Sequence, residues 1–113
     1  MPYRDLNLLD AAERAAHRVN ALIDNSPRRL LYSGQMRDSA QSVGANIAEG
    51  FSRDEGPDRA YRLVLARGEA EETIRHLKSN FTSNRIPPKT YWPLHNLFVT
   101  IVKMITSLLR SME

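Results

Sequence analysis

The sequence predicts an all-α protein, a four-helix bundle in a single domain. Apolar residues recur at spacings of three and four in four segments, which is the period of an amphipathic helix. No segment alternates apolar and polar residues as a strand would, and links of roughly 5 to 8 residues favour antiparallel neighbours. We therefore expect an antiparallel up-down-up-down bundle over residues 1–113, with helices at about 5–24, 28–51, 58–81 and 90–112.

Composition narrows the classes of protein that remain. A content of 42% hydrophobic and 26% charged residues is typical of a folded globular chain, and the absence of cysteine excludes disulfide frameworks and thiolate chemistry. Met1–Asp5 lacks the apolar core of a secretion signal, and the apolar run Leu97–Leu109 is shorter than the ~20 residues a bilayer requires. We expect a cytoplasmic protein with no membrane partner. Of its 16 basic residues 13 are arginine, a side chain suited to phosphate and carboxylate.

The first helix has an apolar stripe and an opposite polar stripe. The apolar stripe is Leu9, Ala12, Ala16, Val19 and Ile23, widened on the same side by Leu8, Ala15 and Leu22. Pro27 follows where the helix must stop. The polar stripe contains the residue types of a metal site, but a solvated face is the commoner meaning of such a pattern. We therefore predict no metal and no cofactor there; the stripe is Asp10, Glu13, His17, Asn20 and Asp24.

The second helix is predicted to begin near Pro27 or Arg28, since proline is favourable in a first turn. Its glycines, Gly34 and Gly44, each cost about 1 kcal/mol relative to alanine, so we expect a neighbouring helix to approach closely at both. Its apolar stripe is Met36, Ala40, Val43 and Ile47, and its polar stripe is Ser39, Ser42, Asn46, Glu49 and Arg53. The polar stripe either contacts a ligand or RNA, or forms hydrogen bonds across helices that fix register, and the second interpretation is favoured.

The last two helices are predicted from longer apolar stripes. The third begins at Pro57-Asp58 and buries Leu63, Ala66, Ala70, Ile74, Leu77 and Phe81. In the fourth, Thr90 is the expected N-cap, which places Pro93 in the first turn. The apolar stripe of this helix is Leu94, Phe98, Ile101, Ile105, Leu108 and Met112. Apolar residues cover more than half of the fourth helix, whereas a bundle core needs an arc of about 100°. We therefore predict a homo-oligomer whose interface contains Val99, Val102 and Leu109.

Residues Ser42 to Arg53 carry a motif. Ser42-Val43, Asn46-Ile47-Ala48-Glu49-Gly50 and Arg53 together resemble the signature of the four-helix proteins encoded in bacterial 23S rRNA intervening sequences, also called S23-type. Gly68 and Glu72 are similar to that family's second motif, although Glu69 and Thr73 depart from it. The resemblance covers essentially the whole chain. It implies the same bundle, a ring of five subunits and, more distantly, likeness to the accessory variability proteins of diversity-generating retroelements, which are described as basic rings that contact nucleic acid.

Signatures of catalysis are missing. His17, His76 and His95 lie on three different helices, and neither His76 nor His95 follows a glutamate at the spacing of di-iron bundles. None of the three follows an arginine at the spacing that small helical RNases use, and no phosphate loop or nucleophile elbow occurs. We predict that the protein is not an enzyme.

Charge is distributed unequally between the two ends of the predicted bundle. The end with the first and third links gathers Arg28, Arg29, Lys78, Arg85 and Lys89 against Asp24, whereas charges at the other end nearly cancel. Such an end is predicted to bind an RNA backbone with little sequence preference. Tyr91 and Trp92 lie near it, either to stack on unpaired bases or to plug the bundle. The alternative function is a protein-binding scaffold or adaptor with no nucleic-acid role.

Overall fold

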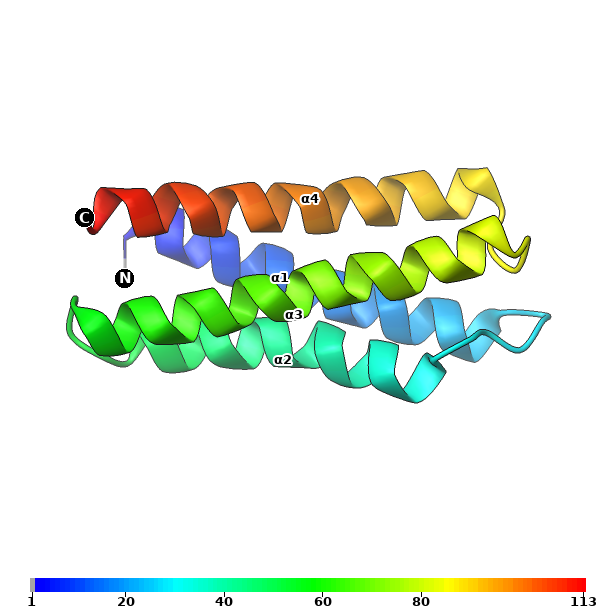
Figure 1. Ribbon diagram of the computed structural model, residues 1–113, viewed down its shortest axis with the longest axis horizontal. Helices are drawn as coiled ribbons and strands as arrows, with labels where there is room; N and C mark the ends of the chain where they lie inside the picture. The colour runs from blue at the N-terminus through cyan, green and yellow to red at the C-terminus, as the bar shows by residue number, and fades with distance from the viewer. Residues whose placement is uncertain (1) are drawn as a thin grey trace.

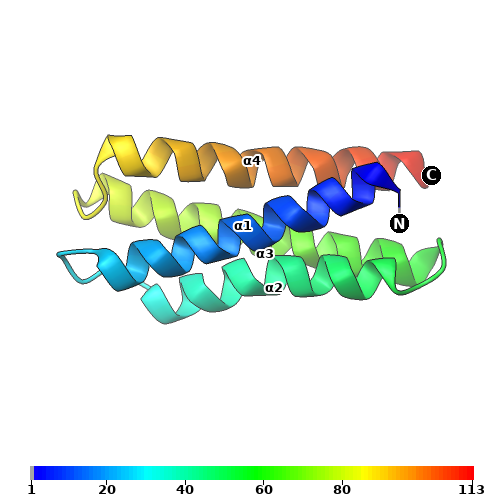
Figure 2. The same ribbon diagram turned by 180° about the vertical axis from the view of Figure 1, so that it is seen from behind.

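The computed structural model describes residues 2–113 and contains four antiparallel helices (Figure 1). The helices are α1 (Tyr3–Asn25), α2 (Ser33–Phe51), α3 (Pro57–Thr82) and α4 (Pro88–Ser111). Each helix packs against the next one in sequence and α4 returns to α1, as the view from behind also shows (Figure 2). The all-α four-helix prediction is confirmed, and no strand occurs within residues 2–113.

The up-down topology divides the connections between two ends (Figure 1). We call the end with links 26–32 and 83–87 the basic end, and the end with link 52–56 and both chain termini the terminal end. The bundle extends 44 Å along its longest axis and about half that across it. The two ends are therefore separate surfaces, each with its own chemistry.

The core is narrower on α1 than the sequence predicts. The predicted apolar stripes of α2 and most of those of α3 and α4 are buried. On α1 the buried apolar positions are Leu8, Ala11, Ala12, Ala15 and Val19, whereas Leu9, Ala16 and Ile23 are only half-buried. Small side chains account for this difference, because they let α1 approach closely along its alanines; a Cβ added at Gly44 would lie 3.8 Å from that of Ala12. Gly34 has no such neighbour within 4 Å, so the predicted close approach there is wrong.

The second helix begins at Ser33, five residues later than Arg28. Leu30 is 5% exposed and contributes to the core from outside the helix. The backbone N–H and C=O of Leu31 form hydrogen bonds of 2.7 and 3.0 Å with the side-chain amide of Asn80, so this segment satisfies its polar groups without a helical turn. Tyr32, with φ of 56°, then turns the chain into α2.

The fourth helix begins earlier than predicted, at Pro88, and its N-cap is Pro87 rather than Thr90. The carbonyl of Pro87 accepts hydrogen bonds from the N–H groups of Thr90 and Tyr91. The two consecutive prolines have the fixed φ that suits a helix start. Pro93 therefore lies in the second turn, inside the helix, where it lacks the N–H that would bond the carbonyl of Lys89.

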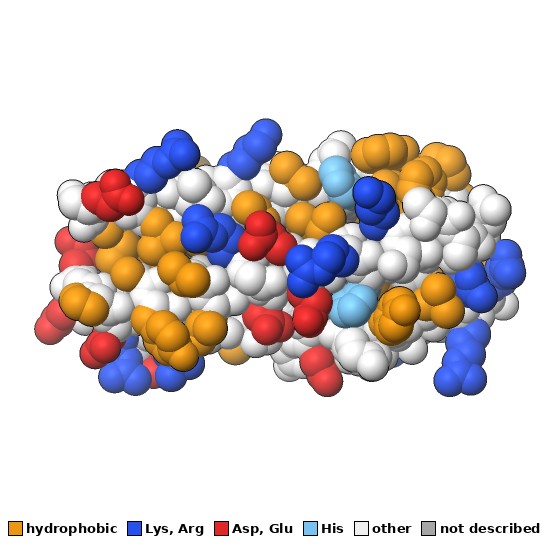
Figure 3. All heavy atoms as spheres, viewed as in Figure 1, with side chains coloured by type: hydrophobic (Ala, Val, Ile, Leu, Met, Phe, Trp, Pro, Cys, Tyr) orange, Lys and Arg blue, Asp and Glu red, His pale blue; other side chains and the backbone are white. Residues whose placement is uncertain are grey.

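By length and composition alone, α4 is long and apolar enough to cross a membrane, and it is the one such helix in residues 2–113. A core helix of a bundle has the same properties, and Leu94, Phe98 and Ile101 of α4 are indeed buried. The remaining apolar residues are less covered: Val99, Val102 and Leu109 are each half-buried. On the neighbouring α3, Tyr61, Val64 and Leu65 are exposed, and hydrophobic side chains gather on this side of the molecule (Figure 3).

Candidate functional site at the basic end

Asn80 of α3 fixes both links of the basic end. Its side chain is fully buried and binds the backbone of Leu31 in link 26–32, while its amide also donates to the carbonyl of His76. Its backbone carbonyl accepts hydrogen bonds of 2.8 and 3.3 Å from the N–H groups of Arg85 and Ile86 in link 83–87. One residue thereby holds two segments that lie about fifty positions apart in sequence.

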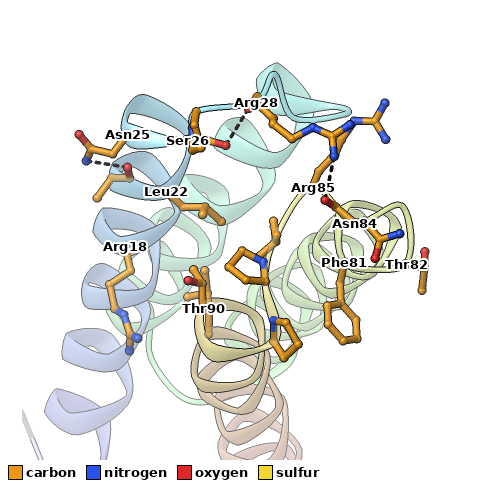
Figure 4. Close-up of a pocket in the computed structure, with 16 residues that line it drawn as sticks. Arg18, Leu22, Asn25, Ser26, Arg28, Phe81, Thr82, Asn84, Arg85 and Thr90 are labelled. Atoms are coloured by element: carbon orange, nitrogen blue, oxygen red, sulfur yellow. Dashed lines mark hydrogen bonds between the residues drawn. The ribbon is translucent and has the colours of Figure 1, made fainter.

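A direct contact also joins the two links. The guanidinium of Arg28 donates a 3.0 Å hydrogen bond to the backbone carbonyl of Asn84 (Figure 4). Asn84 adopts φ of 61°, the left-handed conformation that asparagine tolerates better than most residues. The links are thus ordered by their own backbone geometry and by one arginine that reaches between them.

Between the links and the end of α1 lies a cavity of about 1000 Å³, which we call the end pocket. Its apolar lining comes mainly from Leu22, Phe81, Ile86, Pro87, Pro88 and Leu94. Its polar lining is Arg18, Asn25, Ser26, Arg28, Thr82, Asn84, Arg85 and Thr90, with no Asp or Glu. Figure 4 shows Arg18 on α1 across the opening from Arg28 and Arg85. The pocket therefore has an apolar interior and a positively charged rim.

The structure divides the five predicted RNA-binding residues into two groups. Arg28 and Arg85 line the end pocket, whereas the exposed residues Arg29, Lys78 and Lys89 do not. Sequence reasoning missed Arg18, which comes from two turns inside α1 and reaches the rim. No short motif marks Arg18; only its spacing of four from Leu22, which also lines the pocket, could have indicated it.

Asp24, the one acidic residue that the sequence places at the basic end, forms an ion pair within the protein. Asp24 accepts a 2.5 Å ion pair from Arg37 of α2, whose guanidinium also donates to the side chain of Asn20. Links 26–32 and 83–87 contain no acidic residue of their own. The positive charge of the basic end is therefore not neutralised locally.

An aromatic cluster lies beside the pocket. The rings of Phe81 and Tyr91 are stacked with centroids 4.1 Å apart, and Tyr91 is 3% exposed. Burial raises the pKa of the Tyr91 hydroxyl, so that group stays neutral at ordinary pH. Trp92 meets Phe81 edge to face at 5.7 Å and is 47% exposed. Of the two predicted stacking residues, Tyr91 is part of the hydrophobic plug and Trp92 keeps ring surface in water.

The polar stripe of α2 lies against or near α3. Ser39 is buried and forms a 2.7 Å hydrogen bond with the hydroxyl of Thr73. Asn46 donates to Ser42 one turn earlier, and its side-chain carbonyl accepts from Arg62 of α3 at 3.4 Å. The middle of the stripe is thus engaged within the subunit.

The later signature residues lie at or near the terminal end. Glu49 and Arg53 form an exposed ion pair with each other. A Cβ on Gly50 would lie 3.3 Å from that of Arg62, which explains why the smallest residue occupies this crossing of α2 and α3. Arg59 of α3 donates to the backbone carbonyls of Gly50, Phe51 and Arg53, at the end of α2.

The second motif occupies the outer side of α3. Gly68 is exposed, with nothing within 4 Å of where a Cβ would be, and Glu72 lies 4.0 Å from His76. Burial raises the pKa of the neighbouring Glu69 carboxyl, and the nearby charge of Glu72 adds to the effect. Across residues 2–113 no group of three metal-ligating side chains is assembled; on α1, Asp10 pairs instead with Arg14.

The comparisons with known proteins agree with this architecture. Residues 4–107 match the model of a family described as 23S rRNA-intervening sequence protein. A crystal structure of a protein of unknown function from the S23 ribosomal protein family of Bacteroides thetaiotaomicron VPI-5482 superposes with a TM-score of 0.87. It is 25% identical, and the alignment covers 95% of this chain and 98% of that one. Among curated proteins no match was found.

Proposed function

The chain belongs to the 23S rRNA-intervening sequence protein family, and from that premise we propose that it binds RNA through its basic end without catalysing a reaction. One observation carries the proposal: both links of that end present arginine and neither contains an acidic residue. A phosphate backbone is bound mainly by such fixed positive charge, through release of its counterions.

The arginines of the basic end have hydrogen-bond donors that are not used within the protein, and this supports RNA binding. Arg28 uses one of its five N–H donors on Asn84, and no hydrogen bond or ion pair engages the guanidinium of Arg29 or Arg85 within residues 2–113. Asp24, the acidic residue that the sequence places at this end, is paired with Arg37 instead of with these arginines. The basic end therefore has donors ready for phosphate oxygens.

We also propose that the protein acts as a homo-oligomer, with the family resemblance favouring a pentamer. The half-buried residues Val99, Val102 and Leu109 of α4 lie on the helix beside the exposed Tyr61 and Val64 of α3, and a second copy would bury both sets. Cyclic assembly would place several basic ends on one face. Sedimentation of the chain at micromolar concentration tests this, and a folded monomer would refute it.

A charge-matched pair of variants tests RNA binding. In the first variant Arg28, Arg29 and Arg85 become alanine; in the control Arg4, Arg53 and Arg110 of the terminal end do. Affinity for a structured RNA is measured over a range of salt concentrations. We expect the first variant to lose at least about tenfold in affinity and to reduce the slope of log K against log salt by about two, because up to three phosphate contacts are lost. The control removes the same charge and is expected to change much less.

Equal losses in both variants would mean that net charge, rather than the basic end, drives binding. Absence of binding at low salt would refute the function and favour the scaffold alternative. In that case the exposed side chains Tyr61, Val64 and Leu65 offer a protein-binding face.

A further inference from the structure

We propose that the end pocket holds a single unpaired nucleotide, with its base against the apolar lining and its phosphate at the arginine rim. This inference rests on the proposed RNA function and makes it more specific. It assigns the class of ligand, a nucleoside monophosphate unit, and it distinguishes looped RNA from a continuous duplex.

The size and lining of the pocket suit a small ligand. Its volume of about 1000 Å³ is at the upper end of what ligand pockets enclose. Leu22, Phe81 and Pro88, which are not fully buried, provide an apolar surface that an isolated phosphate ion would leave empty. A flat base would cover this surface, because its π-faces are readily desolvated.

The charge of the rim selects an anion. Arg18, Arg28 and Arg85 line the pocket, and no carboxylate does. Apart from the bond from Arg28 to Asn84, no hydrogen bond or ion pair within residues 2–113 engages these three guanidiniums. Arginine presents planar pairs of donors that match phosphate oxygens, so the rim would fix the phosphate while the interior takes the base.

Neutral polar groups and a neighbouring aromatic ring complete the match to a nucleotide. Thr90 and Asn84 line the pocket, and neither the Thr90 hydroxyl nor the Asn84 side-chain amide makes a hydrogen bond to another residue in the range 2–113. They can pair with base edges or a ribose hydroxyl. Phe81 also lines the pocket and contacts the exposed ring of Trp92, which gives a stacking surface for the next base.

The walls are held in place before a ligand arrives. Asn80 binds both links, and the side chain of Arg28 connects them a second time. A preformed site loses little conformational entropy when it binds a ligand, so even one nucleotide can be bound measurably. Arg28 is consequently both a wall of the pocket and part of its rim.

The test fills the pocket without changing charge. Ala21 is exposed at the opening, and Ala21→Trp places a large side chain there; Ala45→Trp, on an exposed position of α2 away from the pocket, is the control. Titration with adenosine 5′-monophosphate is followed by amide chemical shifts. We expect binding by the parent chain and the control, and at least about a tenfold loss in the filled variant. Adenosine and inorganic phosphate used separately are expected to bind at least about tenfold more weakly than the nucleotide.

A second pair of variants tests the rim. Arg18→Gln is expected to weaken nucleotide binding severalfold, whereas Arg14→Gln, one turn earlier on α1 and paired with Asp10, is expected to leave it unchanged. Thermal unfolding followed by circular dichroism verifies that each variant is folded. Decanoate, an anion with an apolar chain in place of a base, serves as the competing ligand. The proposal is overturned if decanoate binds more tightly than the nucleotide. It is also overturned if Ala21→Trp and Ala45→Trp have the same effect on nucleotide binding.

Two RNA ligands separate this inference from the proposed function. For a hairpin with an unpaired loop, Ala21→Trp is expected to lower affinity about tenfold; for a fully paired duplex it is expected to have no effect. If the parent chain and the Ala21→Trp variant bind the hairpin and the duplex equally well, the proposal that the pocket holds a nucleotide is overturned and the RNA function is left intact. Binding of the free nucleotide without binding of either RNA would support the pocket and refute the RNA function.

Discussion

The two ends of the bundle are each held by one side chain of α3, but those side chains differ in kind. At the basic end the neutral amide of Asn80 is fully buried and binds the backbone of Leu31. At the terminal end the charged guanidinium of Arg59 binds the carbonyls of Gly50, Phe51 and Arg53. In both cases the side chain forms hydrogen bonds with backbone groups that have no partner within a helix.

The choice of side chain determines what each end leaves for a ligand. At the basic end an amide makes the buried bonds to link 26–32, and Arg28 gives one donor to Asn84, so most donors of the arginines remain available to solvent. The terminal end uses an arginine for structure, and its hollow of about 530 Å³ is lined by Arg53 together with Asp54, Glu55 and Asp58. One end is therefore positively charged and preformed, and the other is electrically mixed.

Replacing Asn80 gives the largest expected effect. Asn80→Ala removes both hydrogen bonds to Leu31 and leaves part-buried backbone groups unpaired, so we expect the free energy of unfolding to fall by about 3 kcal/mol. Urea unfolding followed by circular dichroism measures it. Asn46→Ala, an amide whose bonds lie mostly within its own helix, is the control and is expected to cost less than about 1 kcal/mol. Similar losses in both variants would contradict the special role of Asn80.

Replacing Arg59 gives an intermediate effect at the opposite end. Arg59→Ala is expected to lower the free energy of unfolding by about 1.5 kcal/mol, since water can replace the guanidinium at the exposed Arg53 carbonyl but less well at the part-buried carbonyls of Gly50 and Phe51. RNA affinity is expected to stay within about twofold of the parent. A loss of RNA binding as large as that in the triple-arginine variant of the basic end would contradict the division between the ends.

A pair of glycine substitutions gives the smallest effect, with stabilisation expected at one end of the bundle and none at the other. Gly34 begins α2 near the basic end with open space around it, so Gly34→Ala is expected to stabilise the protein by about 0.5–1 kcal/mol. At Gly50, α2 passes close to α3. Gly50→Ala is therefore expected to leave the free energy of unfolding unchanged or to lower it by about 1 kcal/mol. The difference between their unfolding free energies is the informative quantity. Equal stabilisation by both would show that the crossing at Gly50 is not tight.

The sequence was sufficient for the fold because the period of apolar residues reports directly on helices. It was less informative about the links, where long-range bonds decide the conformation. Pro27 suggested an early start to α2, but burial of Leu30 and the pairing of Leu31 with Asn80 keep residues 28–32 out of the helix. Asn80 itself gave no signal in the sequence, since Leu31, which its side chain binds, lies 49 residues away.

Sequence reasoning about the site was correct in its placement of the links and incomplete in its chemistry. It located Arg28 and Arg85 at one end from topology alone. It could not find Arg18 or the pairing of Asp24 with Arg37, because both depend on how far a long side chain reaches across a helix seam. The end pocket could not be predicted, since no local pattern encodes a cavity formed by two stretches far apart in the sequence, 18–28 and 81–94.

The double attachment at Asn80 has a consequence for motion. The amide protons of Leu31, Arg85 and Ile86 all bond to this one residue, so exchange with deuterated solvent will release them together rather than link by link. We expect an opening that displaces Asn80 to loosen both loops. A molecule bound at either loop will consequently slow the exchange of both.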